Sequence, residues 1–228
     1  LSTFNFQLST FNFQLSTMYT LISREKTQLS PGTVVRMLGT WQDYRALCES
    51  RGDSSIPRIK YQHGEIILMS PLPIHGREAH LLARIVELLL DSQNRNYEAF
   101  TPITMELPEA GGIEPDYCFY IENWQAAVGQ DRIDWQTNPP PDLVIEIDVT
   151  SYTAAEDYLP YKVPEVWLFK KSGLKIYALQ NEEYKLQTFS RYFPDLNLPE
   201  LINQVLQVAS DRGTGVALRE VRHQFISQ

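Results

Sequence analysis

Three acidic residues stand where the sequence otherwise predicts buried β-strands. Glu146 and Asp148 interrupt the apolar run 143–149, which is rich in Val and Ile. Asp116 follows a proline at the start of a second run, 117–121. Runs of this length and composition, bounded by Pro and Gly, are typical of buried strands. An ionised carboxylate there is unfavourable unless a cation, hydrogen-bond donors or water surround it, so this region is the expected functional centre.

The same carboxylates are expected to converge on one another. Alternation along a strand places Glu146 and Asp148 on one face, and pairing of the two strands would bring Asp116 beside them. Like charges this close stay ionised only around a cation. Oxygen ligands suit a hard ion, so Mg²⁺ is the expected cofactor, with Mn²⁺ as a substitute, for hydrolysis of a phosphate ester. Alternatively, Asp116 caps a turn and the other carboxylates are merely hydrated.

Composition sets the broad class of the protein. The chain has 228 residues, of which 43% are hydrophobic and 21% charged, as expected for a globular protein with one substantial core. No apolar run approaches the roughly 20 residues of a membrane helix. Cys48 and Cys118 lie far apart in different predicted elements, which favours a reducing compartment, the cytoplasm. The net charge of -8 argues only weakly against nucleic-acid binding, because a nuclease can be locally basic at its cleft.

The first residues form a repeat. Residues 1–17 contain two copies of LSTFNFQ and the start of a third, and Met18 follows directly. The repeat carries no charge, so it lacks the basic region of a targeting peptide. We expect Met18 to be the native start, residues 1–17 to be translated repeat DNA, and residues 18–228 to form a single domain. The alternative is a functional repeat that adds an edge strand or an aggregation-prone tail.

Periodicity predicts a mixed α/β or α+β fold. Thr40 is an expected N-cap for a helix over 41–49, with Asp43 completing a capping-box pattern. Apolar residues at helical spacing predict the principal helix over 75–94. A mixed central sheet flanked by helices accommodates these elements. The remaining pattern predicts strands over 56–61, 65–70, 97–107, 163–170, 174–179 and 184–189, a turn over 108–112, a helical turn near 124–128, and helices over 198–208 and 216–225.

Several motifs together resemble a known family. They are TWQDYRALCESRG, PRIKYQHGEIILMSP, HGREAHLLARIVELL, EPDYCFYI, PPDLVIEIDVTS and VPEVWLF, in this order. This series is similar to the Uma-two family of restriction-endonuclease-type proteins, in the PD-(D/E)XK nuclease superfamily, over most of residues 40–190. The resemblance implies a restriction-endonuclease-like αβββαβ core and a Mg²⁺-dependent DNA endonuclease. It also allows a homodimer, since restriction-type nucleases commonly pair.

The resemblance also assigns roles to residues. It implies that Asp116 and Glu146 bind Mg²⁺ and that the backbone carbonyl of Ile147 completes the ligand set. The superfamily usually has a lysine two residues after the glutamate, where this chain has Asp148, and the segment 152–161 contains no lysine. This departure favours an alternative, a catalytically impaired nuclease-fold module that binds nucleic acid or protein. An unrelated metal-dependent hydrolase of small molecules is a further alternative.

Two residues near the start of the long helix are additional candidates. His75 resembles a histidine common after the family's Ser-Pro segment, and Glu78 resembles the glutamate that superfamily members place near the metal from their first helix. Both could reach the cleft, although a histidine at a helix start more often caps the helix or lies on the surface. Lys170, Lys171 and Lys175 are predicted to lie on a solvated hairpin.

Overall fold

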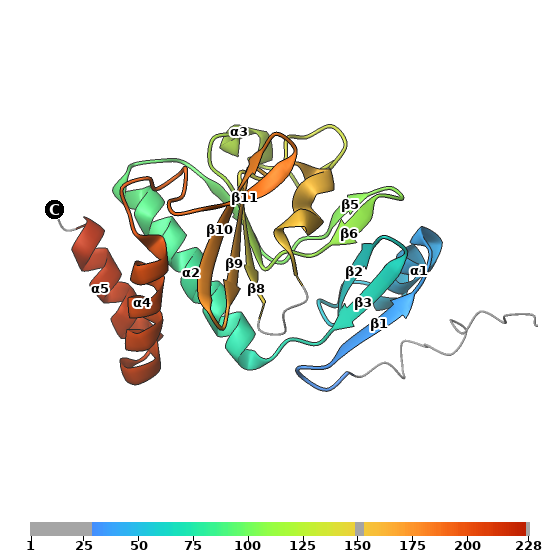
Figure 1. Cartoon of the computed structure of the whole chain (residues 1–228), viewed down its shortest axis with the longest axis horizontal. Helices are drawn as coiled ribbons and strands as arrows, with labels where there is room; N and C mark the ends of the chain where they lie inside the picture. Colours follow the sequence, from blue (N-terminus) through green and yellow to red (C-terminus); the bar gives the residue numbers. More distant parts are fainter. Residues whose placement is uncertain (1–28, 149–152, 227–228) are drawn as a thin grey trace, which may run out of the picture.

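The computed structural model describes residues 29–148 and 153–226. The expected start at Met18 and the repeat before it lie outside these residues. Two β-sheets flanked by helices make up the described chain (Figure 1). The strands are β1 (Val34–Leu38), β2 (Arg58–Gln62), β3 (Glu65–Met69), β4 (Glu98–Phe100), β5 (Met105–Leu107), β6 (Gly111–Ile113), β7 (Tyr117–Tyr120), β8 (Leu143–Ile147), β9 (Glu165–Lys170), β10 (Gly173–Gln180) and β11 (Glu183–Gln187). The helices are α1 (Trp41–Arg51), α2 (Pro73–Ser92), α3 (Trp124–Ala127), the 3₁₀ helix η2 (Ala155–Tyr161), α4 (Leu198–Arg212) and α5 (Thr214–Ile226).

The larger sheet has the mixed character that the sequence predicts. Its strand order is β11-β10-β9-β8-β7-β4, in which β8 and β9 are parallel and the other neighbours antiparallel. The resemblance implies an αβββαβ order, and the larger sheet and its helices follow it. The elements in this order are α2, β4, β7, β8, η2 and β9, so the second helix is a 3₁₀ helix. The predicted fold class is therefore confirmed.

Strand β8 is buried on both faces, which explains its nearly continuous apolar sequence. Ile145 and Ile147 belong to the core formed with α2. Val144 belongs to the core on the other face, where Tyr158 of η2 packs. Glu146 points to this second face and contacts Tyr158. A carboxylate is thus enclosed between a central strand and a short helix.

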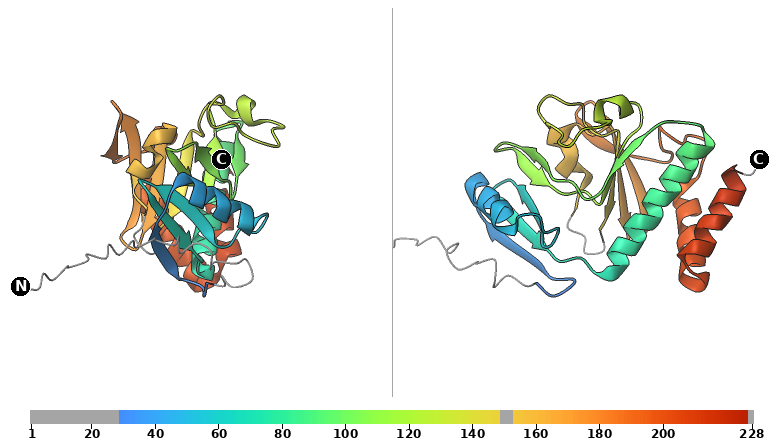
Figure 2. Two further views of the ribbon diagram at one scale, coloured as in Figure 1. Left: turned by 90° about the vertical axis from the view of Figure 1, so that its right-hand side faces the viewer. Right: turned by 180° about the vertical axis from the view of Figure 1, so that it is seen from behind.

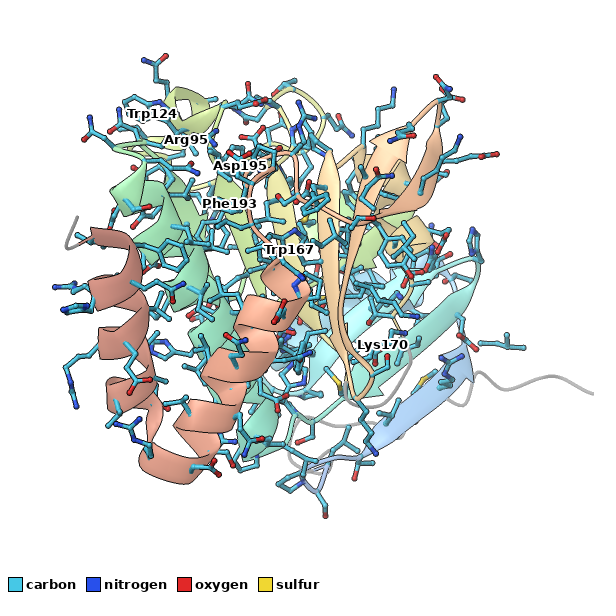
Figure 3. The ribbon with its side chains drawn as sticks, turned by 60° about the vertical axis from the view of Figure 1, so that its left-hand side comes forward. Arg95, Trp124, Trp167, Lys170, Phe193 and Asp195 are labelled. Atoms are coloured by element: carbon cyan, nitrogen blue, oxygen red, sulfur yellow. The ribbon has the colours of Figure 1, made fainter. Side chains whose placement is uncertain are left out.

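Three helices cover one face of the larger sheet. The amphipathic helix α2 packs on β8, α4 packs on β10, and α5 packs against both helices (Figures 1 and 2). Trp167 of β9 and Phe193 lie in contact between the sheet and these helices, with ring centroids 6.2 Å apart (Figure 3). This core fixes the strands that carry the acidic residues.

The smaller sheet has the order β1-β3-β2-β6-β5 and is covered by α1. Thr40 and Asp43 form the predicted capping box at the start of α1. Tyr44 of α1 lies directly over Gly112 of β6, so closely that a Cβ on Gly112 would overlap the tyrosine ring. Only glycine lets α1 approach β6 this closely.

Two predictions about the middle of the chain are wrong. The stretch 97–107 is not one strand, because β4 joins the larger sheet and β5 the smaller. The chain crosses between the sheets at 101–104, which contains Pro102, a residue that cannot donate to a strand ladder. The predicted turn over 108–112 is shorter, since β6 begins at Gly111. None of the described helices is long and apolar enough to cross a membrane.

Candidate active site

Asp116 and Glu146 lie side by side at the junction of the two sheets. Strands β7 and β8 pair antiparallel with Tyr117 opposite Ile145, which brings the residues that flank this pair together. Both carboxylates are buried. The N–H of Ile147 donates to Asp116 Oδ2 over 2.7 Å and so ties Asp116 to the strand that carries Glu146. The pairing expected from the sequence therefore forms.

Asp116 is held in its charged form by donors from two other elements. Arg58 of β2 forms an ion pair with its Oδ1, and His75 Nε2, from the first turn of α2, donates to the same oxygen over 2.7 Å. Burial alone would raise the pKa of Asp116, but the His75 hydrogen bond and the Arg58 charge outweigh burial and lower it. Asp116 is thus a fixed anion at neutral pH.

The pKa of Glu146 is shifted in the opposite direction from that of Asp116. Burial raises the pKa of Glu146 to about 8, and the nearby Asp116 charge adds to this rise. The hydroxyl of Tyr158 donates to Glu146 Oε1, and this hydrogen bond opposes the rise without cancelling it. Glu146 therefore tends to hold a proton near neutral pH unless another positive charge is added.

A small cavity opens beside Glu146, and Asp116 lies behind the residues that line it. Its volume is about 60 Å³, several times the roughly 15 Å³ that one water requires. The side chains that line it come from both sheets and include Arg58, Lys60, Glu114, Glu146 and Thr153. The cavity can therefore hold a small ion together with part of its water.

Ion pairs neutralise the other acidic side chains around this cavity. Glu114 Oε1 lies 2.6 Å from Arg51 Nη1, and Lys60 forms an ion pair with Asp157 of η2. None of the ion pairs among the described residues reaches Glu146, whose hydrogen bond comes from the uncharged Tyr158 hydroxyl. The charges of Arg58 and Lys60 lower the pKa of Glu146, but less than burial and Asp116 raise it, so its negative charge is only partly compensated.

Asp148, the third carboxylate of the expected group, is paired with a cation on the neighbouring strand. Strand β8 ends at Ile147, and Asp148 Oδ2 lies 2.9 Å from Lys170 Nζ at the end of β9. It also accepts the N–H of Thr153 over 3.1 Å, while Lys170 donates to the Thr153 carbonyl. Lys170 is therefore not the merely solvated residue that the sequence predicted. Figure 3 places Lys170 at the opposite end of the sheet from Arg95 and Trp124.

The remaining candidates separate into near and distant residues. His75 contacts Asp116 directly. Glu78 is half-buried, and none of the hydrogen bonds or ion pairs of the described residues joins it to Asp116 or Glu146. Burial raises the pKa of Glu78, although Arg77 and His75 oppose this rise.

Sequence reasoning missed Arg58, Lys60 and Tyr158 as residues of the site. A signal for the first two exists in the sequence Arg-Ile-Lys-Tyr, because alternation places Arg58 and Lys60 on one face of β2. Their partners, however, lie 58 and 97 residues away along the chain. Only the tertiary structure reveals which carboxylates they meet.

The donor set limits which metal could bind here. Among residues 29–148 and 153–226, no three His, Cys, Asp or Glu side chains group as a metal site. Two carboxylates alone still suit Mg²⁺, which usually keeps several waters and takes only one or two carboxylates from the protein. Oxygen-only ligands fit that ion better than zinc, which is usually bound by nitrogen or sulfur.

A comparison with solved structures finds the same fold in another protein. The chain resembles "a putative nuclease belonging to DUF820 from Anabaena variabilis ATCC 29413" with a TM-score of 0.51 and 16% identity, over 78% of this chain and 98% of that chain. This likeness shows a shared fold. The family model Uma2, described as "Putative restriction endonuclease", matches residues 41–209, so the chain belongs to the Uma2 family. No curated protein matches the chain.

Proposed function

We propose that this protein is a Mg²⁺-dependent endonuclease that hydrolyses phosphodiester bonds in DNA. The observation that carries the proposal is the pair of buried carboxylates, Asp116 and Glu146, on adjacent strands, with a cavity beside Glu146. Two adjacent carboxylates that lack one positive charge are the arrangement a divalent ion stabilises. The description of the Uma2 family as restriction endonucleases supports DNA as the substrate.

Asp116 and Glu146 would hold the ion, with the backbone carbonyl of Ile147 as a third ligand. Strands β7 and β8 pair only as far as Ile145 of β8. The backbone of Ile147 therefore lies past the end of the pairing with β7. When bound, the ion activates a water and stabilises charge on the phosphate. Mn²⁺ would substitute for Mg²⁺, because it also accepts oxygen ligands.

The other side chains hold these ligands in place. Arg58 and His75 fix the orientation of Asp116, and Tyr158 fixes that of Glu146. Fixed ligands leave less rearrangement to occur during the reaction. In this proposal Asp148 acts indirectly, because it holds Thr153 at the rim of the cavity through the contact with Lys170.

A divalent-metal titration on DNA tests the proposal. Supercoiled and linear DNA, with single-stranded RNA as a comparison, are incubated with wild type, Asp116→Ala and Glu146→Ala over a range of Mg²⁺ and Mn²⁺ concentrations. We expect cleavage that requires metal and disappears in both variants together with metal binding. Unchanged cleavage in Asp116→Ala would refute the assignment of the ligands.

The outcomes also separate the alternatives. DNA binding without cleavage by the wild type would identify a nuclease-fold binding module, and cleavage of small phosphate esters but not DNA would identify a small-molecule hydrolase. A homodimer and a cytoplasmic location remain predictions. Light scattering on the purified protein tests the dimer, and cell fractionation tests the location.

A further inference from the structure

Resting on the proposed function, we infer that Lys60 is a catalytic residue whose ammonium group contacts a non-bridging oxygen of the scissile phosphodiester. No sequence motif marks Lys60 for this role. The inference follows from its place on β2, its unused donors and the charge balance of the cavity.

Strand β2 divides its side chains between a core and the cavity. Ile59 and Tyr61 face α1 and pack with Tyr44. Arg58 and Lys60, two residues apart, point to the other face, where both line the cavity with Glu146. The Lys60 side chain is 16% exposed, and it lies between this cavity and a smaller one that Asp157 also lines.

The other cations near the cavity are already engaged. Arg58 is paired with Asp116, whose side chain is fully buried, and Arg51 is paired with Glu114 and donates to the Pro57 carbonyl over 3.2 Å. If either arginine moved to a substrate, it would leave a buried carboxylate without its partner.

Lys60 can contact a substrate without giving up its present partner. Its ammonium has three donors, and among the described residues the hydrogen bond to Asp157 uses one of them. Asp157 also accepts the N–H of Ala154 over 2.9 Å, so it stays fixed on η2 and holds Lys60 at the cavity. Two donors therefore remain for other acceptors.

A phosphodiester brings a further negative charge into this cavity. The proposed ion balances Asp116 and Glu146, and Arg58 remains bound to Asp116. A phosphate oxygen that gains charge in the transition state needs a donor already in position, and lysine commonly serves this role in phosphoryl transfer. Lys60 lines the cavity with donors to spare, and its carboxylate partner, Asp157, unlike the partner of Arg58, is not a proposed ligand of the ion.

The competing interpretation is that Lys60 only tethers β2 to η2 through Asp157. A Lys60 that contacts the phosphate and a Lys60 that only tethers β2 predict different effects on cleavage when Asp157 is removed. Removing Asp157 breaks the tether but keeps the amine, whereas removing Lys60 alone leaves Asp157, only 12% exposed, as an unpaired carboxylate. The matched comparison is therefore Asp157→Asn against the double variant Lys60→Met with Asp157→Asn, which differ only in the amine.

The experiment measures Mg²⁺-dependent cleavage of supercoiled DNA, binding of Mn²⁺ alone by calorimetry, and thermal unfolding for both proteins. We expect Asp157→Asn to lose part of the wild-type cleavage, because Lys60 is then held less firmly, and the double variant to lose about 10²- to 10³-fold more than Asp157→Asn. Lys60→Arg in the Asp157→Asn background should restore part of the loss, because it returns a donor. Mn²⁺ affinity should change by only a few-fold in all three.

A binding measurement keeps the inference distinct from the proposed function. With Ca²⁺ in place of Mg²⁺, the salt dependence of DNA affinity should have a slope smaller by about 1 in the double variant, as expected for one lost phosphate contact. Equal cleavage and equal slopes in Asp157→Asn and the double variant would overturn the role of Lys60. Absence of metal-dependent cleavage by wild type would overturn the proposed function instead, while the slope would still test Lys60.

Discussion

Arg58 and Asp116 form a buried ion pair that joins the smaller sheet to the start of β7. The Asp116 side chain is fully buried and that of Arg58 is 17% exposed, so water screens their attraction little. Asp116 and Glu146 raise the pKa of Arg58 more than burial lowers it. In the metal-free protein Arg58 is therefore the principal counter-charge of the carboxylate pair.

Loss of Arg58 should destabilise the metal-free protein. Arg58→Met leaves Asp116 buried with only His75 as a side-chain partner, and we expect a loss of about 3 kcal/mol in the free energy of unfolding. Saturating Mg²⁺ should reduce this loss, because the ion supplies the missing charge. Urea unfolding with and without Mg²⁺ measures both values. Arg212→Met, which breaks an exposed pair with Glu220, is the control and should cost less than about 1 kcal/mol.

The stability of the metal-free protein should fall as the pH rises from about 4.5 to about 8. Glu146 has a pKa near 8 in the folded state against 4.5 for an ordinary glutamate, so the folded state binds the additional proton in this interval. Each pKa unit corresponds to about 1.4 kcal/mol, so the contribution amounts to several kcal/mol. The lowered pKa of Asp116 has the opposite effect: it makes stability rise with pH, but only at pH values below the ordinary pKa of an aspartate.

Thermal unfolding at several pH values tests this dependence. Glu146→Gln should flatten the slope between pH 5 and about 8, because the amide does not titrate. Mg²⁺ affinity of the wild type should increase over the same interval, since a proton must leave Glu146 before the ion binds. A slope that is equal in wild type and Glu146→Gln contradicts the prediction.

Asp148 and Lys170 should act mainly on stability. Lys170→Met leaves Asp148 buried and without this cation, so it should cost about 3 kcal/mol. Asp148→Asn should cost less, because Lys170 is 26% exposed and can turn to water, and the amide oxygen still accepts the Thr153 N–H. Unfolding measures the stability, and calorimetry should show unchanged Mg²⁺ affinity in both. A large loss of affinity in Asp148→Asn would instead make Asp148 a ligand.

Gly112 should not tolerate a larger residue. A Cβ at this position overlaps the Tyr44 ring, so Gly112→Ala should cost about 1–3 kcal/mol through overpacking. Gly76→Ala is the matched control, since it lies in helix α2 with nothing near the added methyl, and should be neutral or stabilise by up to about 1 kcal/mol. Chemical unfolding of the two proteins compares them directly. Equal effects would show that Tyr44 moves aside easily.

Local patterns predicted most of the elements and the central pair of the site. The capping box around Thr40 marks the start of α1, and the apolar run around Glu146 marks β8 as a buried strand. Patterns failed where distant segments decide the structure. The chain changes sheets at 101–104, and β2 joins β6 through a single pair, Tyr61 opposite Gly112, which no local signal encodes.

The charges of the site were the hardest part to predict. Sequence showed a carboxylate in an apolar strand, but its ionisation depends on Arg58, Lys60 and Tyr158, which arrive from distant segments. Asp148 likewise could not be separated from Glu146 by alternation. Its ion pair arises because β9 presents Lys170 beside it.

The contact between Lys60 and Asp157 has a consequence for the order of folding. The two residues are 97 positions apart, and closing a loop of that length is entropically unfavourable until other contacts compensate. The local hairpins of each sheet can form first. The charged residues that line the cavity come together only after the two sheets have packed against each other. A chain growing from the ribosome therefore lacks the completed site until η2 has emerged, which delays any nucleolytic activity until most of the protein has folded.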